Sequence, residues 1–225
     1  MDSSRLPGKA LMDIGGRPLL GHVIDRVRRV RDRASRGFPV VVATSDHRKD
    51  DPVADFARAE GVAVFRGAAE DVAKRCVDCA EAFGFDDLAR ISGDSPFIDA
   101  HLMALMIAER QRRGVDIATN VLPRSCPAGN AMEIVTTEAM RRVLSRTQDP
   151  EDREHVTRYI YGHPEEFTIW SHHEPPEAFA GVRVVVDAPE DLERARWIVS
   201  RLDGPVATAP FASIAELSRQ WKESA

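Results

Sequence analysis

A short loop near the start of the chain carries two cations whose spacing suits a polyphosphate. Its residues are Ser3, Ser4, Arg5, Leu6, Pro7, Gly8 and Lys9. Gly8 lets a ligand approach the backbone closely, and the ammonium group of Lys9 can meet phosphate as a compact point charge. Only four of the 31 basic residues are lysines, which favours a chemical role for Lys9. The alternative is an ordinary basic N-terminal tail.

Two acidic residues follow apolar runs that have the character of strands. Asp94 comes after residues 87–91 in RISGDSPFID, and Asp187 comes after residues 182–186 in VVVDAPEDLE. A helix-capping role is the alternative, but Asp99 is the better placed cap for the helix that follows, which leaves Asp94 without that duty. Mg²⁺ prefers a few carboxylates and completes its shell with water and phosphate oxygens. We therefore predict that Asp94 and Asp187 form a Mg²⁺ site.

The three cysteines are too few for a disulfide framework and fit a reducing compartment. Cys76 and Cys79 form a CxxC, but they lie inside an expected helix, whereas a redox pair normally opens one. We therefore expect the CxxC to be structural, with redox chemistry as the alternative. A zinc site is disfavoured because no second CxxC or closely spaced histidine pair completes four ligands. The motifs GxxxxGK[ST] and GxGxxG are absent, which argues against a P-loop or a dinucleotide-binding domain.

Short β-branched runs alternate with helical patterns along most of the chain. The expected strands cover residues 39–44, 62–65, 87–91, 115–118 and 182–186. The expected helices cover residues 18–33, 51–60, 69–83, 99–112, 137–146, 151–161 and 190–201. Strands separated by helices indicate an α/β fold with a mostly parallel sheet, in which ligands bind at the carboxyl ends of the strands. The sequence has no repeat or linker, so we expect a single domain over residues 1–225.

Length and composition narrow the class of protein. The 225 residues, 43% hydrophobic and 30% charged, are ordinary values for a globular chain with a sizeable core. The formal net charge of −5 provides no overall positive field for nucleic acid or an anionic membrane. The longest apolar stretches, such as residues 102–108, are far shorter than the roughly 20 residues of a membrane span. We therefore expect a cytoplasmic protein with no nucleic acid or membrane partner.

Six blocks carry a resemblance to a known family. They are SSRLPGKALMDIGGRPLLGHVIDRV, VVVATSD, VFRGAAEDV, RISGDSPFID, REHVTRYIY and VVVDAPEDLE. Because it has these blocks in this order, the chain resembles the cytidylyltransferases of the spore coat polysaccharide biosynthesis type, which are relatives of the CMP-sialic acid and CMP-Kdo synthetases. The resemblance implies a three-layer α/β/α nucleotidyltransferase fold, GT-A-like and Rossmann-like, with a mostly parallel mixed sheet and CTP as the donor.

The same resemblance implies roles for individual residues. For the triphosphate loop they are Ser4, Arg5, Gly8 and Lys9; for the base pocket, Ala43, Thr44 and Asp46; for Mg²⁺, Asp94 and Asp187; and for the acceptor sugar, Asn120, Glu133, Arg153 and His155. Arg66, Asp71 and Arg75 also fit the pattern, without an assigned role. For His155 a structural hydrogen bond, and for Glu133 a simple surface charge, are the alternatives.

The implied reaction is attack by a hydroxyl group of a sugar, a 2-keto sugar acid, on the α-phosphorus of CTP. It gives a CMP-sugar and pyrophosphate for surface polysaccharide synthesis, with Arg5 and Lys9 stabilising the charge on the departing pyrophosphate. One alternative is a GT-A glycosyltransferase that uses a nucleotide-sugar, although its DxD pair is missing because Ser95 and Pro96 follow Asp94. The other is a catalytically silent nucleotide-binding or oligomer-forming remnant. The cytidylyltransferase interpretation is also compatible with a homodimer.

Two departures from the family pattern lead to further expectations. Family members often have an acidic residue where this chain has Ala131, so the sugar recognised is expected to differ. They also begin with a strand ahead of the phosphate loop, whereas Met1 stands almost at the start of that loop. We therefore expect the sheet to lack its first strand and residues 1–9 to be mobile or displaced.

Overall fold

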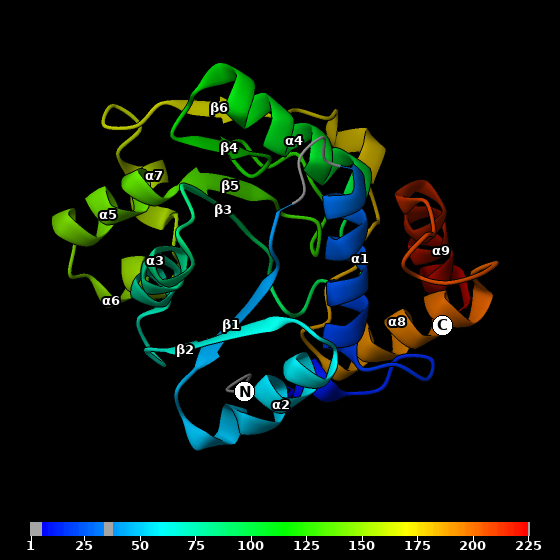
Figure 1. Ribbon diagram of the computed structural model, residues 1–225. Helices are drawn as coiled ribbons and strands as arrows, with labels where there is room; N and C mark the ends of the chain where they lie inside the picture. The colour runs from blue at the N-terminus through cyan, green and yellow to red at the C-terminus, as the bar shows by residue number, and fades with distance from the viewer. Residues whose placement is uncertain (1–5, 34–37, 225) are drawn as a thin grey trace.

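The computed structural model describes residues 6–33 and 38–224. The strands in these ranges are β1 (Val41–Ser45), β2 (Ala63–Gly67), β3 (Asp87–Arg90), β4 (Ile117–Thr119), β5 (Glu133–Thr136) and β6 (Ile169–Ser171). The helices are α1 (Leu19–Arg33), α2 (Asp51–Ala59), α3 (Val72–Phe83), α4 (Ala100–Arg113), α5 (Thr137–Arg146), α6 (Pro150–Glu154), α7 (Arg158–Gly162), α8 (Pro189–Arg201) and α9 (Phe211–Ser224). Figure 1 shows this succession of strands and helices from one end of the chain to the other.

The strands pair in both directions. β1 and β2 form a parallel pair, and the other four strands form a sheet in the order β3-β5-β4-β6. β5 is antiparallel to both of its neighbours, whereas β4 and β6 are parallel. Because β5 runs against β3, its first residue, Glu133, lies opposite the last residue of β3, Arg90. This register places Glu133 at the edge of the sheet from which the chain continues toward Asp94.

Helices cover the strands on two sides, which confirms the expected three-layer α/β/α architecture. In Figure 1, α3, α5, α6 and α7 lie on the left of the strands, α1, α8 and α9 lie on the right, and α4 lies across the top beside β4 and β6. α3 packs against α5, α1 against α4, and α8 against α9. Their apolar faces form separate buried clusters, one around Val77, Met140 and Ile160 and another around Ile24 and Ile198. Burial of these side chains supplies the main driving force for the fold.

The helix expected over residues 151–161 is two short helices, α6 and α7, and not one. The chain leaves the helical conformation at Val156, whose φ of 21° lies in the left-handed region. The Val156 side chain is fully buried, and the Thr157 hydroxyl donates to the buried carboxylate of Glu133. These tertiary contacts outweigh the local helical pattern.

The strand expected over residues 182–186 is also wrong as a strand, although the segment is buried on one face. It makes an isolated parallel bridge between Arg183 and Ala128. The Val184 N–H donates to the carbonyl of Ala128, and the Val186 N–H donates to the carbonyl of Asp94. The segment therefore pairs with two different loops, so no continuous ladder forms.

The start of the described chain is packed against the core. Leu6 is buried in the cluster that contains Ile24 and Ile198, and Lys9 begins a short 3₁₀ turn that ends at Leu11. The expectation that residues 6–9 are displaced is therefore wrong. Residues 1–5 lie outside the described residues, and the expectation of an absent first strand stays a prediction.

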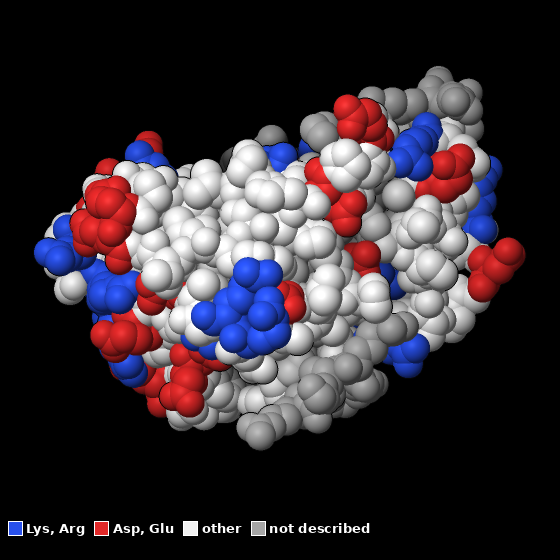
Figure 2. Space-filling view, turned by 90° about the horizontal axis from the view of Figure 1, so that it is seen from above, with Lys and Arg blue, Asp and Glu red and all other residues white. Residues whose placement is uncertain are grey.

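Charges of both signs share the surface. Figure 2 shows Lys and Arg side chains next to Asp and Glu side chains over the face seen from above Figure 1. Many oppositely charged side chains pair within a single helix. On α4, for example, Arg112 and Arg113 both pair with Glu109. In the described ranges, none of the helices has the length and apolar character needed to cross a membrane.

Candidate active site

The loop expected to bind phosphate, of which residues 6–9 are described, contains a tight turn. Gly8 has a φ of 75°, a left-handed conformation that glycine adopts without steric cost. The N–H of Lys9 donates to the Leu6 carbonyl, and the N–H of Leu11 donates to the Gly8 carbonyl. The turn directs the Lys9 side chain toward the loops that follow β3 and precede α8. Ser4 and Arg5 lie outside the described residues.

Asp94 lies in the loop between β3 and α4. The Ser95 N–H donates to the Ser92 carbonyl and closes a turn around Asp94, while Phe97 is fully buried and anchors the loop. Asp99 caps α4, because its Oδ1 accepts hydrogen bonds from the first N–H groups of the helix. The expectation that Asp99 is the cap is therefore confirmed, and the Asp94 carboxylate has no capping duty at α4.

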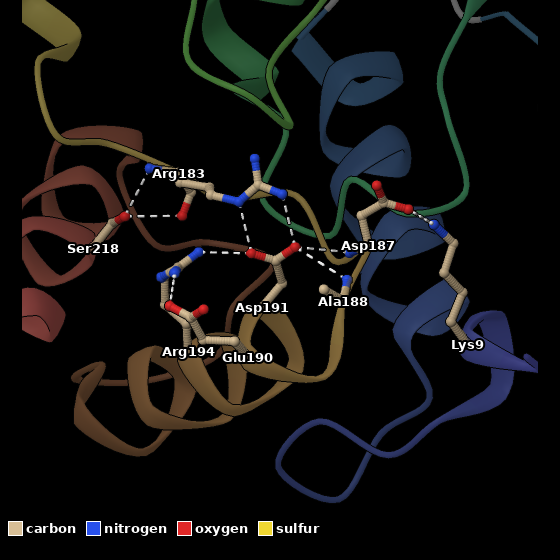
Figure 3. A network of polar contacts seen from close by, with 8 residues as sticks. All are labelled: Lys9, Arg183, Asp187, Ala188, Glu190, Asp191, Arg194 and Ser218. Carbon is tan, nitrogen blue, oxygen red and sulfur yellow. Dashed lines mark hydrogen bonds and ion pairs between the residues drawn. The ribbon is translucent and has the colours of Figure 1, made fainter. Parts of the chain in front are cut away.

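Lys9 bridges the carboxylates of Asp94 and Asp187. Its Nζ lies 2.9 Å from Oδ2 of Asp94 and 3.2 Å from Oδ1 of Asp187. The three side chains are 17–24% exposed, so all of them can be reached from solvent. Figure 3 shows Lys9 and Asp187 pointing toward each other from separate segments. Lys9 thus meets Asp94, which lies 85 positions later in the sequence, and Asp187, which lies 178 positions later.

This donor set fits the predicted Mg²⁺. Two carboxylates converge on a point beside which a positive charge already sits, and carboxylate oxygens are the ligands that this hard cation prefers. No group of three or more His, Cys, Asp or Glu side chains among the described residues could hold a metal ion. Mg²⁺ bound here would therefore take two protein ligands, Asp94 and Asp187, and fill its shell with water and phosphate oxygens.

A cavity of about 210 Å³ opens at the carboxyl end of β1. Its lining residues are Ala43, Thr44, Ser45, Lys49, Asp50, Ala69 and Arg75. Ala43 and Thr44, which were expected at a base pocket, are in this lining, whereas Asp46 is exposed and outside it. The hydroxyl groups of Thr44 and Ser45 both donate to the buried Asp50 carboxylate. The cavity therefore has a polar wall that sequence reasoning missed at Asp50.

Arg75 and Arg66 are fixed by backbone carbonyl groups near this cavity. Arg75 donates to the carbonyls of Ala68 and Ala69, and Arg66 donates to the carbonyls of Ser45 and His47. The two arginines therefore brace the loops that follow β1 and β2.

Glu133 is buried and accepts hydrogen bonds from three protein side chains. Its Oε1 accepts hydrogen bonds from the hydroxyls of Thr157 and Tyr161, and its Oε2 accepts one from Arg90 at 3.4 Å. Burial, with the neighbouring Glu133 carboxylate, raises the pKa of Tyr161 far above its ordinary value. The Tyr161 hydroxyl therefore stays protonated and donates. Glu133 is not the simple surface charge that was considered as an alternative.

The other three expected acceptor residues lie in different settings. Asn120 is fully buried, donates to the Asn130 carbonyl and accepts from the Met132 N–H. Arg153 is held by Asp71 at 3.0 Å and by the carbonyls of residues 144 and 147. His155 is exposed at the end of α6. Of the four, His155 has the side chain most open to solvent.

The cysteines lie in protected surroundings. Cys76 and Cys79 are both within α3, and all three cysteines are free thiols. Burial raises the pKa of Cys76, and burial together with the neighbouring Cys76 raises the pKa of Cys79 to about 11. Because the thiolate is the reactive form, these surroundings disfavour reaction at Cys79, as expected for a structural residue.

Comparison with known proteins places this geometry in a family. A family model described as cytidylyltransferase matches residues 1–209. The chain is 36% identical over 197 residues to the spore coat polysaccharide biosynthesis protein SpsF of Bacillus subtilis, which covers 86% of this chain and 80% of that protein. It is 30% identical over 179 residues to the 3-deoxy-manno-octulosonate cytidylyltransferase of Hahella chejuensis, covering 76% and 68% of the two chains.

A solved structure agrees over nearly the whole chain. The structure of a cytidylyltransferase from Leptospira borgpetersenii superposes with a TM-score of 0.89 at 27% identity. The match covers 99% of this chain and 92% of that one. The resemblance and the nucleotidyltransferase fold expected from the sequence are confirmed. The chain belongs to the cytidylyltransferase family.

Proposed function

We propose that this enzyme transfers CMP from CTP to a hydroxyl group of a sugar acid, giving a CMP-sugar and pyrophosphate. The observation that carries the proposal is the meeting of Lys9 with Asp94 and Asp187 at one edge of the sheet. Nucleotidyl transfer needs groups that hold a triphosphate and offset the charge that builds on its oxygens. Lys9 supplies a phosphate-binding cation, and Asp94 and Asp187 supply a pair of metal ligands.

Lys9 and Arg5 are proposed to bind the triphosphate. When CTP enters, we expect the Lys9 ammonium to turn toward the β- and γ-phosphates and to release the carboxylate oxygens of Asp94 and Asp187 to the metal. The charge that develops on the departing pyrophosphate would then face the Lys9 ammonium. Asp94 and Asp187 would hold Mg²⁺, which when bound polarises the phosphate oxygens and favours attack by the sugar hydroxyl.

The cavity beside β1 is the proposed place of the nucleotide base. Ala43 and Thr44 form part of its wall, and Asp50 and Ser45 supply hydrogen-bonding groups of fixed orientation. We expect the volume of about 210 Å³ to accommodate a flat ring. Asp46, which lies outside the lining, has a weaker claim to contact the base.

The acceptor is proposed to be a 2-keto sugar acid whose CMP derivative serves surface polysaccharide synthesis. Among the expected acceptor residues, His155 offers an exposed side chain, whereas Asn120, Glu133 and Arg153 already hold protein groups. We propose that these three shape the acceptor side through the segments that they hold. The three free cysteines fit a reducing compartment, and we propose the cytoplasm as the site of the reaction.

A pyrophosphate-release screen tests this function. The four ribonucleoside triphosphates are each combined with a panel of sugar acids and neutral sugars in the presence of Mg²⁺. The expected result is pyrophosphate release that requires both CTP and a sugar acid. Equal release with all four nucleotides would contradict the base selectivity. CTP binding without turnover for any sugar would instead favour a silent nucleotide-binding protein, and activity with a nucleotide-sugar donor would favour a glycosyltransferase.

A further inference from the structure

A buried carboxylate lies directly behind Asp187. Asp191, in the first turn of α8, is 4% exposed and accepts five hydrogen bonds. Its Oδ2 lies 3.1 Å from the backbone nitrogens of both Asp187 and Ala188, and 2.9 Å from Nη2 of Arg183. Its Oδ1 lies 2.7 Å from Nε of Arg183 and 2.8 Å from Nη1 of Arg194. Figure 3 shows this network, with Asp191 on the opposite side of Asp187 from Lys9.

The surroundings of the Asp191 carboxylate favour its charged form. Burial alone would raise its pKa, but the hydrogen bonds from Arg183 and from the backbone N–H of Asp187 hold the pKa below its ordinary value. A negative charge at the N-terminus of α8 is also favoured by the helix dipole. The Asp191 carboxylate thus has two arginines and two backbone donors around it.

The segment that carries Asp187 is held at its other end as well. Ser218, on α9, accepts a hydrogen bond from the Arg183 N–H at 3.0 Å and donates to the Arg183 carbonyl at 2.9 Å. Arg183 thus links α9, through its backbone, to Asp191 on α8, through its side chain. Residues 183–188 are tied to both helices, although they form no continuous ladder with a strand.

We infer that Asp191 is a positioning residue that fixes the main chain of Asp187 and thereby aims the Asp187 carboxylate at the proposed metal. This inference rests on the proposed function, because it assumes that Asp187 is a metal ligand. An ordinary capping carboxylate in the first turn of a helix bonds the N–H of the cap residue, here Ala188. Asp191 also bonds the N–H of Asp187 itself, so it acts on the residue that supplies the ligand.

The Asp191→Asn variant tests the inference. It keeps the shape of the side chain but removes the charge and one acceptor oxygen. We expect the backbone amide of Asp187 to lose protection from hydrogen exchange. Residues that support a metal ligand typically change metal affinity or activity by about tenfold to a hundredfold. We expect a loss of this size in Mn²⁺ affinity, measured by electron paramagnetic resonance with CTP and without acceptor, against a sample of Mn²⁺ and CTP alone.

Two further variants separate positioning from stability. Asp191→Glu restores the charge on a longer side chain and should recover part of the Mn²⁺ affinity. Glu190→Gln is the matched control, because Glu190 is the preceding residue of the same turn and bonds Arg194 from an exposed position. It removes one negative charge from the same helix end, and we expect it to leave Mn²⁺ affinity and exchange at Asp187 unchanged.

The outcomes distinguish this inference from the proposed function. If Asp191→Asn lowers the melting temperature but keeps both the parental exchange at Asp187 and the parental Mn²⁺ affinity, Asp191 is only a helix cap and the inference is overturned. Lost protection with parental Mn²⁺ affinity also overturns it, since Asp187 would then not need to be held. If the parent itself binds no Mn²⁺ with CTP, the proposed metal site fails. In that case, hydrogen exchange at the Asp187 backbone amide is the measurement that shows whether Asp191 fixes the main chain.

Discussion

Lys9 is the residue whose removal should separate the two halves of the site. In the absence of nucleotide its ammonium contacts one oxygen of each carboxylate, at 2.9 and 3.2 Å, so we expect it to compete with Mg²⁺ for them. In the presence of CTP the same ammonium is proposed to bind the triphosphate. The variant Lys9→Met should therefore change metal affinity and nucleotide affinity in opposite directions.

The size of the metal effect follows from the two contacts. A hydrogen bond between charged groups contributes about 1.5–3 kcal/mol, and solvent screening of an exposed pair reduces an ion pair to about 1 kcal/mol or less. With side chains 17–24% exposed, we take about 1 kcal/mol for each contact, in line with screened pairs. The sum of about 2 kcal/mol corresponds to roughly a 30-fold change in an equilibrium constant.

The assay is a titration of nucleotide-free protein with Mn²⁺, followed by electron paramagnetic resonance, with calorimetry for CTP and CMP. For Lys9→Met we expect Mn²⁺ to bind up to roughly 30-fold more tightly, by the free energy above. CTP should bind more weakly, and CMP should change little because it lacks the phosphates that Lys9 meets. Lys74→Met is the control, since Lys74 pairs with Asp78 on the exposed face of α3. Unchanged or weaker Mn²⁺ binding, or equal losses for CTP and CMP, would refute this reasoning.

Three further predictions concern the carboxylates. Asp94→Asn and Asp187→Asn should each fold normally and lose most activity, because a neutral amide is a poor ligand for a hard cation; circular dichroism and a turnover assay check this, and near-parental turnover in either variant argues against the metal site. Glu133→Ala should lower the free energy of unfolding by about 2–5 kcal/mol, since buried donors lose their acceptor; an unchanged melting temperature with a raised acceptor KM would make Glu133 a sugar ligand instead. Because the pKa of Asp191 is held below its ordinary value, its contribution to stability is present at neutral pH and is lost as the pH falls below about 4; unfolding of Asp191→Asn should show a weaker pH dependence there, and an identical pH profile would contradict this.

Local patterns predicted most of the helices because their causes are local. The expected helix over residues 137–146 coincides with α5, whose apolar face and Thr136 cap are both readable in the sequence. The expected helix over residues 99–112 differs from α4 by one residue at each end, between the Asp99 cap and Gly114. Amphipathic spacing, a capping side chain and a left-handed glycine act within a few residues of each other.

Features that depend on distant contacts could not be predicted in this way. The break at Val156 is held by the bond from Thr157 to Glu133, 24 residues earlier in the chain. β6 has only three residues and takes its place by pairing with β4, far away in sequence. Residues 182–186 have the composition of a strand but pair with two loops instead. The sequence of a short apolar run does not determine which other segment it will pair with.

In the candidate site, too, some residues could be predicted from the local sequence and others could not. Asp94 and Asp187 could be chosen because each follows an apolar run ahead of a helix, and the structure brings both to Lys9. The polar wall at Asp50 was missed because nothing near it in the sequence marks a cavity. Asp191 was also missed, although its position three residues after Ala188 has the spacing of a capping carboxylate.

The most direct test of the central claim is ³¹P nuclear magnetic resonance of CTP with a sugar acid, Mg²⁺ and the enzyme. Transfer at the α-phosphorus predicts that the CTP signals are replaced by pyrophosphate and by a single phosphodiester signal from a CMP-sugar, and that Asp187→Asn abolishes the change. The appearance of CDP and inorganic phosphate, or parental product formation by Asp187→Asn, would contradict the account.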